Sequence, residues 1–117
     1  MNVKQFYETI NGNYSKALET MMSEDFIKRM LLKFLDSSTY NDLLEAAKNK
    51  DIVGIFNATH MLKGVAGNLS LTPLQEKASR VCEMVRHPSN DLPDLDKELD
   101  ELLKLYQSIN NNLALLR

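Results

Sequence analysis

Apolar residues recur every three or four positions along most of this chain, a spacing that places them on one face of a helix. Runs of strictly alternating β-branched residues, which would indicate strands, do not occur in the sequence. The pattern therefore predicts an all-α protein. The most regular apolar stripe consists of Leu95, Leu99, Leu102, Tyr106, Ile109, Leu113 and Leu116.

Glycine, proline and short polar residues divide this pattern into segments. Helices are expected over residues 3–10 and 14–22, with breaks at 11–13, 36–39 and 87–93. Several amphipathic helices joined by short loops favour an up-and-down antiparallel four-helix bundle. We expect a short additional helix at the N-terminus and a single domain over residues 1–117.

Side chains at the expected helix starts support these divisions. Ser23 and Asp51 are suitable N-caps for two of the helices. Thr72 is expected to cap the next helix, with Pro73 at its first position and Gln75 reaching back in a capping box.

The segment over residues 58–71 has a helical period but contains two glycines, Gly64 and Gly67. An interior helix glycine costs up to about 1 kcal/mol relative to alanine, so their presence needs a reason. At about 100° per residue, both glycines fall within about 40° of His60, and Lys63 lies about 60° away. The apolar seam of this helix is centred about 130° from His60, so we expect the histidine to lie outside the core. The seam consists of Ile52, Ile55, Thr59, Leu62, Ala66 and Leu69.

A histidine on a bare stretch of helix suits a nucleophile that another protein must approach closely. Neutral imidazole is nucleophilic near pH 7 and can accept a phosphoryl group on a ring nitrogen. Lys63 would place its ammonium beside the added oxygens, and a solvated surface lysine is an equal alternative. The two glycines would open the approach to His60, the alternative being close helix packing. Val53 and Phe56 lie beside the same face, as docking surface or as the edge of the core.

Composition narrows the function classes further. The 117 residues carry a net charge of −2 and no basic block, so nucleic acid is not an expected partner. The apolar stretches are far shorter than a membrane span, and the N-terminus lacks the apolar core of a signal peptide. The one cysteine, Cys82, excludes an internal disulfide and fits a reducing compartment. We expect a cytoplasmic protein without membrane association.

The run His-x-Leu-Lys-Gly-x-Ala-x-Asn-Leu over residues 60–69 resembles the signature of histidine-containing phosphotransfer (HPt) domains. The similarity extends over nearly the whole chain: residues 14–35 resemble the first two bundle helices of that family, and residues 52–57 resemble the lead-in to its histidine. The resemblance implies that His60 is the phosphorylated residue and that Lys63 and Gly64 are the motif lysine and glycine.

The resemblance also implies the partners. His60 would take a phosphoryl group from the phospho-aspartate of one receiver domain and pass it to the aspartate of another, on a hybrid histidine kinase and a response regulator. The receiver would supply Mg²⁺, while this chain would need no cofactor or metal of its own and would be a carrier without kinase activity. We expect the partner-binding surface to include Val53, Phe56, Asn57, Gly67 and Asn68.

The sequence departs from the family pattern at two positions. Ser70 stands where many members have glycine, at the expected end of the helix, where the change should matter little. Cys82 stands where some members have a glutamine that contacts the histidine ring. Another group, such as a backbone carbonyl or a water molecule, must therefore orient the ring of His60.

Other function classes fit the sequence less well. A di-iron carboxylate bundle needs glutamate three residues before histidine, and Asn57 and Met84 occupy those positions. A histidine kinase needs glycine-rich phosphate loops that this chain lacks. Met61 follows His60 where dimeric kinase bundles usually have a carboxylate, so we expect a monomer. A regulatory module that docks a receiver or a kinase without transferring phosphate is the remaining alternative.

Overall fold

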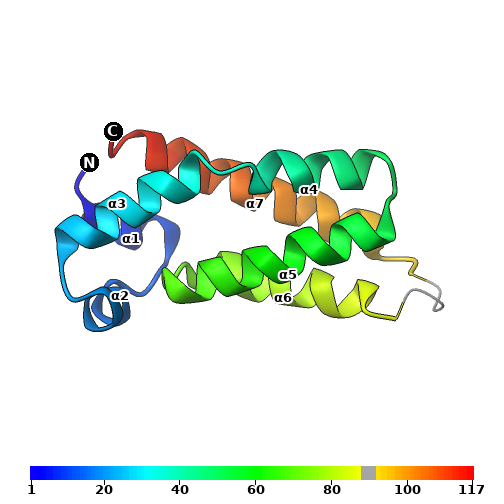
Figure 1. Ribbon diagram of the computed structural model, residues 1–117, viewed down its shortest axis with the longest axis horizontal. Helices are drawn as coiled ribbons and strands as arrows, with labels where there is room; N and C mark the ends of the chain where they lie inside the picture. Colours follow the sequence, from blue (N-terminus) through cyan, green and yellow to red (C-terminus); the bar gives the residue numbers. More distant parts are fainter. Residues whose placement is uncertain (88–91) are drawn as a thin grey trace.

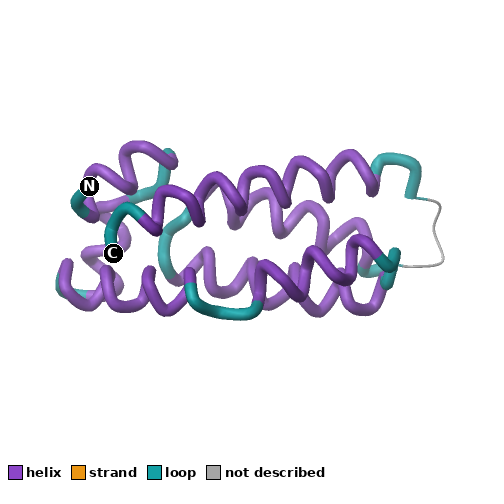
Figure 2. The backbone as a smooth tube through the Cα atoms, turned by 90° about the horizontal axis from the view of Figure 1, so that it is seen from above, coloured by secondary structure: helices purple, strands orange, loops and turns teal. Residues whose placement is uncertain are grey.

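The computed structural model describes residues 1–87 and 92–117, so the predicted loop at 87–93 lies mostly outside the described residues. Seven helices and no strand occur in the described part of the chain (Figures 1 and 2). The all-α prediction is confirmed. The helices are α1 (Val3–Ile10), α2 (Tyr14–Met21), α3 (Glu24–Leu35), α4 (Thr39–Lys48), α5 (Ile52–Asn68), α6 (Thr72–Val85) and α7 (Leu95–Ala114).

The helices form an elongated bundle in which successive long helices run in opposite directions (Figure 1). Helices α3 and α4 follow one another along one edge, separated by a break over residues 36–38, which is one residue shorter than the predicted 36–39 because Thr39 begins α4. Helix α5 returns beside α4, α6 packs on α5, and α7 packs on α6 and closes the bundle against α3 and α4. Both termini lie at the α3 end of the bundle (Figure 1). The bundle therefore holds α5 between α4 and α6.

The two N-terminal helices pack at that same end. Helix α2 contacts α1 and α3 and does not run along the bundle (Figure 1). The expectation that residues 14–35 supply two bundle helices was therefore wrong, because α3 together with α4 forms the first long element. Helix α2 ends one residue earlier than predicted, since Met22 adopts a left-handed C-cap conformation with φ of 73°.

The core consists of the apolar stripes predicted from the sequence. All seven residues of the stripe between Leu95 and Leu116 are buried, and only Ile52 of the α5 seam is half-buried. Burial of a large apolar side chain contributes about 1.5–3 kcal/mol, so these stripes dominate the stability of the bundle. In α4, Leu43 and Ala46 are buried, whereas Leu44 and Ala47 are half-buried; the sequence had predicted an apolar stripe of Leu43, Leu44 and Ala47 there.

The turn between α5 and α6 is held by the N-terminal segment. The Tyr7 hydroxyl donates a hydrogen bond of 2.7 Å to the carbonyl oxygen of Leu69, and the Asn13 amide donates one of 3.0 Å to that of Ser70. Gly12 lies so close that an added Cβ would be 3.0 Å from the Ser70 carbonyl oxygen. The N-terminal segment therefore fixes the end of α5.

The predicted start of α6 was wrong in its details. The helix begins at Thr72, so its N-cap is Leu71, and no side chain caps it. Pro73 consequently occupies the second helical position. The Gln75 side chain lies against Gly67 of α5 in place of the expected capping box. The Gln75 side chain therefore contacts the neighbouring helix and does not form a local capping hydrogen bond.

None of the described helices is both long enough and apolar enough to pass through a membrane.

Candidate functional site

Helix α5 carries the candidate nucleophile on the face opposite to the core. The Asp51 side chain caps its start by accepting a hydrogen bond of 3.0 Å from the Gly54 amide. Ile55, Thr59 and Leu62 are buried, and His60 is exposed. The prediction that His60 lies outside the core is therefore confirmed.

The two glycines of α5 have different surroundings. A Cβ added at Gly64 would meet nothing within 4 Å, so the helix surface one turn from His60 is open. A Cβ added at Gly67 would lie 2.8 Å from Nε2 of Gln75 on α6. The expectation that Gly67 clears the approach was therefore wrong, because a side chain of the neighbouring helix already fills that space. Gly64 alone has the open surroundings expected of both.

The ring of His60 is stacked on an aromatic neighbour. The Phe56 and His60 ring centroids are 5.7 Å apart, and the ring planes differ by 15°. Within the part of the chain that the structure describes, no side chain or backbone group forms a hydrogen bond with the imidazole. Among the described residues, the stacking contact with Phe56 is therefore the interaction that can orient the ring of His60.

Helix α6 contributes to the surroundings of Phe56. The guanidinium carbon of Arg86, at the C-terminal end of α6, lies 5.6 Å from the Phe56 ring centroid. Arg86 also forms an ion pair of 3.0 Å with Glu83, one turn earlier. Phe56 and Arg86 line a hollow of about 170 Å³ together with Ile52, Val53 and Val85. Val53 is 68% exposed and Phe56 is half-buried, so Val53 is surface whereas Phe56 is at the edge of the core.

Lys63 is the cation nearest in sequence to His60, one helical turn away. Its side chain is half-buried, and it forms no ion pair with any of the described residues. No carboxylate among the residues that the structure describes therefore neutralises its charge. An anion added to His60 would find a positive charge on the same helix.

Comparison with known protein families decides the class of this helix bundle. Residues 29–112 match the family model described as Hpt domain. The chain belongs to the Hpt domain family. The match begins within α3 and ends within α7, so it includes the whole of α4, α5 and α6. No curated protein and no solved structure matched the chain. Family membership indicates a histidine phosphotransfer role in a phosphorelay.

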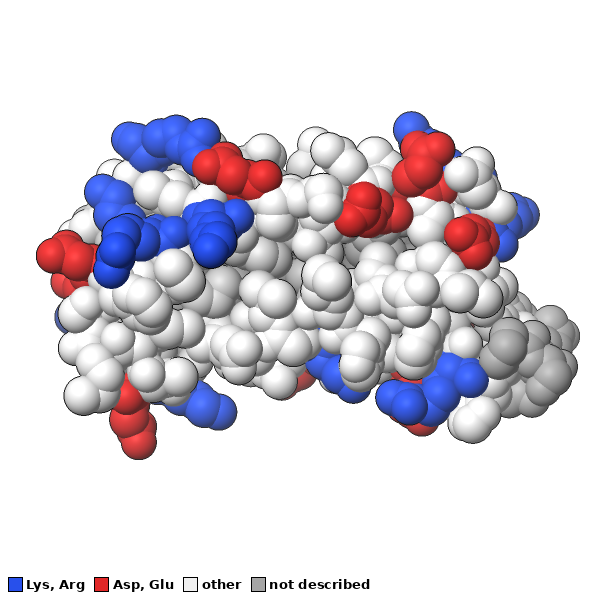
Figure 3. All heavy atoms as spheres, viewed as in Figure 1, with Lys and Arg blue, Asp and Glu red and all other residues white. Residues whose placement is uncertain are grey.

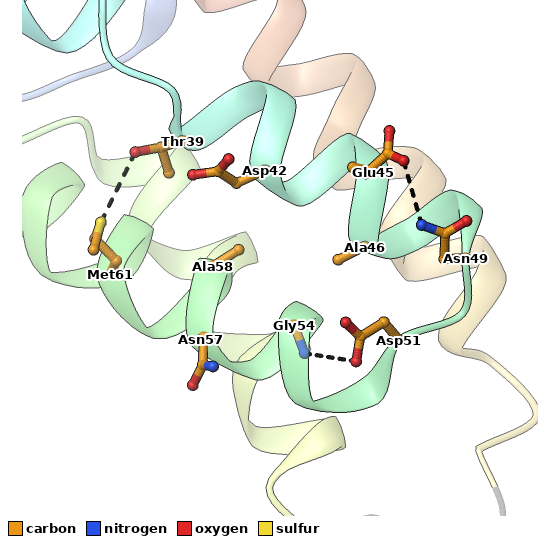
Figure 4. Close-up of a pocket in the computed structure, with 10 residues that line it drawn as sticks. All are labelled: Thr39, Asp42, Glu45, Ala46, Asn49, Asp51, Gly54, Asn57, Ala58 and Met61. Atoms are coloured by element: carbon orange, nitrogen blue, oxygen red, sulfur yellow. Dashed lines mark hydrogen bonds between the residues drawn. The ribbon is translucent and has the colours of Figure 1, made fainter.

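A cleft of about 360 Å³ separates α4 from α5 on one side of the HPt motif. The carboxylates of Asp42 and Asp51 point into it from its two walls (Figure 4). Met61 on α5 brings its sulfur within 4.0 Å of the Thr39 hydroxyl oxygen at the other end (Figure 4). Asn57, which was predicted to bind the partner, is exposed at the lower rim. The cleft gives the HPt domain an acidic flank.

Beyond Met61, an apolar groove of about 330 Å³ runs between α5 and α3. Met30 and Phe34 line it from α3, and Val65 and Asn68 line it from α5. In Figure 3, basic side chains gather over α3 and acidic ones over α4, and few charged side chains lie over α5, which runs alongside these two helices. Asn68, which the sequence predicted to bind the partner, is exposed beside this groove.

Two residues of this neighbourhood were not found from the sequence. Arg86 and Gln75 lie on α6 and reach α5 only through the packing of the two helices. Their contacts with Phe56 and Gly67 cross from one helix to the next, so no spacing within a single helix could indicate them. Cys82, by contrast, is buried in the core and is 1% exposed. A small buried thiol fits packing within the HPt bundle.

Proposed function

We propose that this protein carries a phosphoryl group on His60 from the phospho-aspartate of one receiver domain to the aspartate of another. The observation that carries the proposal is an exposed histidine on an HPt motif helix, with open space at Gly64 and with Lys63, which forms no ion pair among the described residues, one turn away. An aspartyl active site in a receiver must come close to the imidazole, and the bare surface at Gly64 allows that approach.

Each half of the transfer is a displacement at phosphorus. The unprotonated nitrogen of His60 attacks phosphorus, an N–P bond forms, and the P–O bond to the donor aspartate breaks. The aspartate leaves as a carboxylate with the electron pair of that bond. In the second half, the carboxylate of the acceptor attacks phosphorus and the electron pair of the N–P bond returns to the imidazole. Such reactions depend mainly on positioning and on neutralisation of phosphoryl charge.

The residues of this chain have distinct roles in the proposal. Lys63 places positive charge beside the phosphoryl oxygens, and Gly64 leaves room for the receiver. Val53, Phe56, Asn57 and Asn68 form the surface around the histidine on which the receiver docks.

The remaining features of the proposal concern the protein's setting. The receivers belong to a hybrid histidine kinase and a response regulator, and Mg²⁺ belongs to the receiver, while this chain uses no cofactor and no ATP. We further propose that the protein acts as a monomer in the cytoplasm, consistent with its single buried cysteine.

Intact mass spectrometry can test the carrier role directly. The wild-type protein is incubated with a panel of receiver domains phosphorylated by acetyl phosphate, beside His60→Gln and the matched control His87→Gln, which changes the other histidine of the chain. We expect an acid-labile phosphoryl adduct on the wild type and on His87→Gln, and none on His60→Gln. Circular dichroism should show equal helix content in all three proteins.

Two outcomes would contradict the proposal. An adduct that persists on His60→Gln would place the phosphoryl group elsewhere. Binding of receivers to the wild type without any adduct would indicate a regulatory module that docks a receiver or a kinase and does not transfer phosphate.

A further inference from the structure

Phe56 and His60 are placed so that their rings contact each other. They are four residues apart on α5, and side chains at that spacing lie on the same helix face. The centroid distance of 5.7 Å and the interplanar angle of 15° correspond to an offset stack, one of the favoured geometries for aromatic pairs. The contact therefore defines the plane in which the imidazole lies.

The ring of an exposed histidine needs such a contact if it is to have one orientation. The second side-chain torsion of histidine is broad, so an imidazole without neighbours rotates through many positions. No hydrogen bond to the ring occurs among the described residues, and the plane of Phe56 excludes rotations that would tip the imidazole into it. Reacting atoms must be aligned for displacement at phosphorus, so a fixed ring plane raises the fraction of productive encounters.

Phe56 is itself held by the neighbouring helix. It is half-buried, and the Arg86 guanidinium lies over its ring at 5.6 Å from the centroid. A cation over an aromatic face is attracted by the ring electrons. The ion pair with Glu83 also restrains Arg86. The chain of contacts therefore runs from the end of α6 through Phe56 to the nucleophile.

We propose that Phe56 is a positioning residue that orients the imidazole of His60 for phosphoryl transfer, and that Arg86 holds Phe56 in place. This inference rests on the proposed function. It assigns Phe56 a role beyond offering apolar surface to a receiver, and it gives α6 a part in the reaction at α5.

Transfer kinetics distinguish positioning from docking. The variants are Phe56→Leu, which keeps an apolar side chain without a ring, and Phe56→Tyr, which keeps the ring. We measure the maximal rate constant of transfer from a phosphorylated receiver and the receiver concentration that gives half of it. For Phe56→Leu we expect the maximal rate constant to fall about fivefold with little change in the half-saturating concentration. Phe56→Tyr should retain the wild-type rate constant.

The orientation of the ring can be observed without any partner. In the stacked arrangement, the carbon-bound protons of the His60 imidazole experience the ring current of Phe56. We expect their NMR signals to move toward random-coil positions in Phe56→Leu and to stay near the wild-type positions in Phe56→Tyr. Circular dichroism of both variants should match the wild type, which excludes loss of the fold as the cause.

Arg86→Gln tests whether Arg86 holds Phe56 in place. We expect the maximal rate constant to fall about twofold and the His60 signals to move part of the way toward those of Phe56→Leu. Arg29→Gln is the matched control, because Arg29 lies over the ring of Phe26 at 5.4 Å on α3, away from this stack. It should leave both the rate constant and the His60 signals unchanged.

The results separate this inference from the function on which it rests. A wild-type protein that accepts no phosphoryl group from any receiver would overturn the proposed function. A phosphorylated wild type together with a Phe56→Leu variant of unchanged maximal rate constant would overturn the role of Phe56 alone. A raised half-saturating concentration with an unchanged maximal rate constant would show that Phe56 only docks the receiver.

Discussion

Gly64 is the residue whose structural surroundings bear most directly on access to the histidine. It has no neighbour that a Cβ would touch, so packing gives no reason for glycine in the middle of this helix. Its propensity cost of up to about 1 kcal/mol is therefore attributable to the space that it leaves beside His60.

Substitution at Gly64 should separate stability from transfer. We expect Gly64→Ala to raise the free energy of unfolding by about 0.5–1 kcal/mol, since alanine favours the helix and meets no obstacle. Gly64→Gln should be at least as stable as the wild type but slow transfer strongly, because its longer side chain obstructs the receiver. Urea denaturation and transfer rates provide the two measurements. Equal transfer rates for Gly64→Gln and the wild type would refute the access argument.

Lys63 should tune the reaction without being essential to it. An exposed charge pair contributes about 0–1 kcal/mol, so Lys63→Ala should slow transfer by no more than about fivefold. Lys63→Arg, which keeps the charge, is the matched control, and its transfer rate should fall less than that of Lys63→Ala. Rate measurements with one receiver at low and high salt would check the electrostatic origin. Complete loss of transfer in Lys63→Ala would mean that the lysine has a larger role.

At the scale of elements, the site depends on how α6 packs against α5. Gln75 fills the space over Gly67, and Arg86 reaches Phe56 one helix away. The two contacts lie at opposite ends of α6. The helix therefore closes one part of the α5 surface and supports the stacked rings at another.

A double-mutant cycle can measure the contact at Gly67. The Cβ of Gly67→Ala would approach Gln75 Nε2 to 2.8 Å, so the amide must move and part of the gain in helix propensity is lost. In a Gln75→Ala background no such obstacle exists. We therefore expect Gly67→Ala to stabilise the protein by about 0.5 kcal/mol more in that background than in the wild type. If urea denaturation shows that Gly67→Ala raises the free energy of unfolding equally in both backgrounds, Gln75 does not occupy this space.

At the scale of the whole molecule, an ion-pair network joins α6 to α7. The Lys77 ammonium pairs with Glu98 at 2.6 Å and also with Glu101, and Arg80 approaches Glu98 at 3.2 Å. The hydrogen bond from Lys77, together with the charge of Arg80, holds the pKa of the Glu98 carboxyl below its ordinary value. The network fixes the helix that supports Phe56 to the rest of the bundle.

This network makes stability depend on pH in a defined direction. Because the pKa of Glu98 is lower in the folded than in the unfolded state, the unfolded chain binds the proton first as pH falls. The stabilisation is therefore present above the unfolded pKa of about 4.5 and is lost as pH falls through the lower folded value. Urea denaturation should show Glu98→Gln destabilised at pH 7, with the difference from the wild type shrinking below about pH 4.5. A difference that does not change with pH would exclude this linkage.

The sequence by itself determined the class of fold and the exposed position of His60, the proposed nucleophile. The buried seam of α5 and the stripe from Leu95 to Leu116 follow from helical periodicity, because each residue's face depends only on its number along the helix. The same arithmetic predicted that His60 would be exposed. The break before Thr39 followed from local turn chemistry, and the motif around His60 indicated the family.

Only the tertiary structure decided which contacts reach that helix from elsewhere. Periodicity placed Gly64 and Gly67 on one face, but the packing of α6 left the first open and covered the second with Gln75. It also brought Arg86 to Phe56, and it made α3 and α4 one long element of the bundle while α2 packed at its end. These outcomes depend on how separate helices pack together. The periodicity of one helix identifies its buried face but not the side chains of the neighbouring helix that cover it.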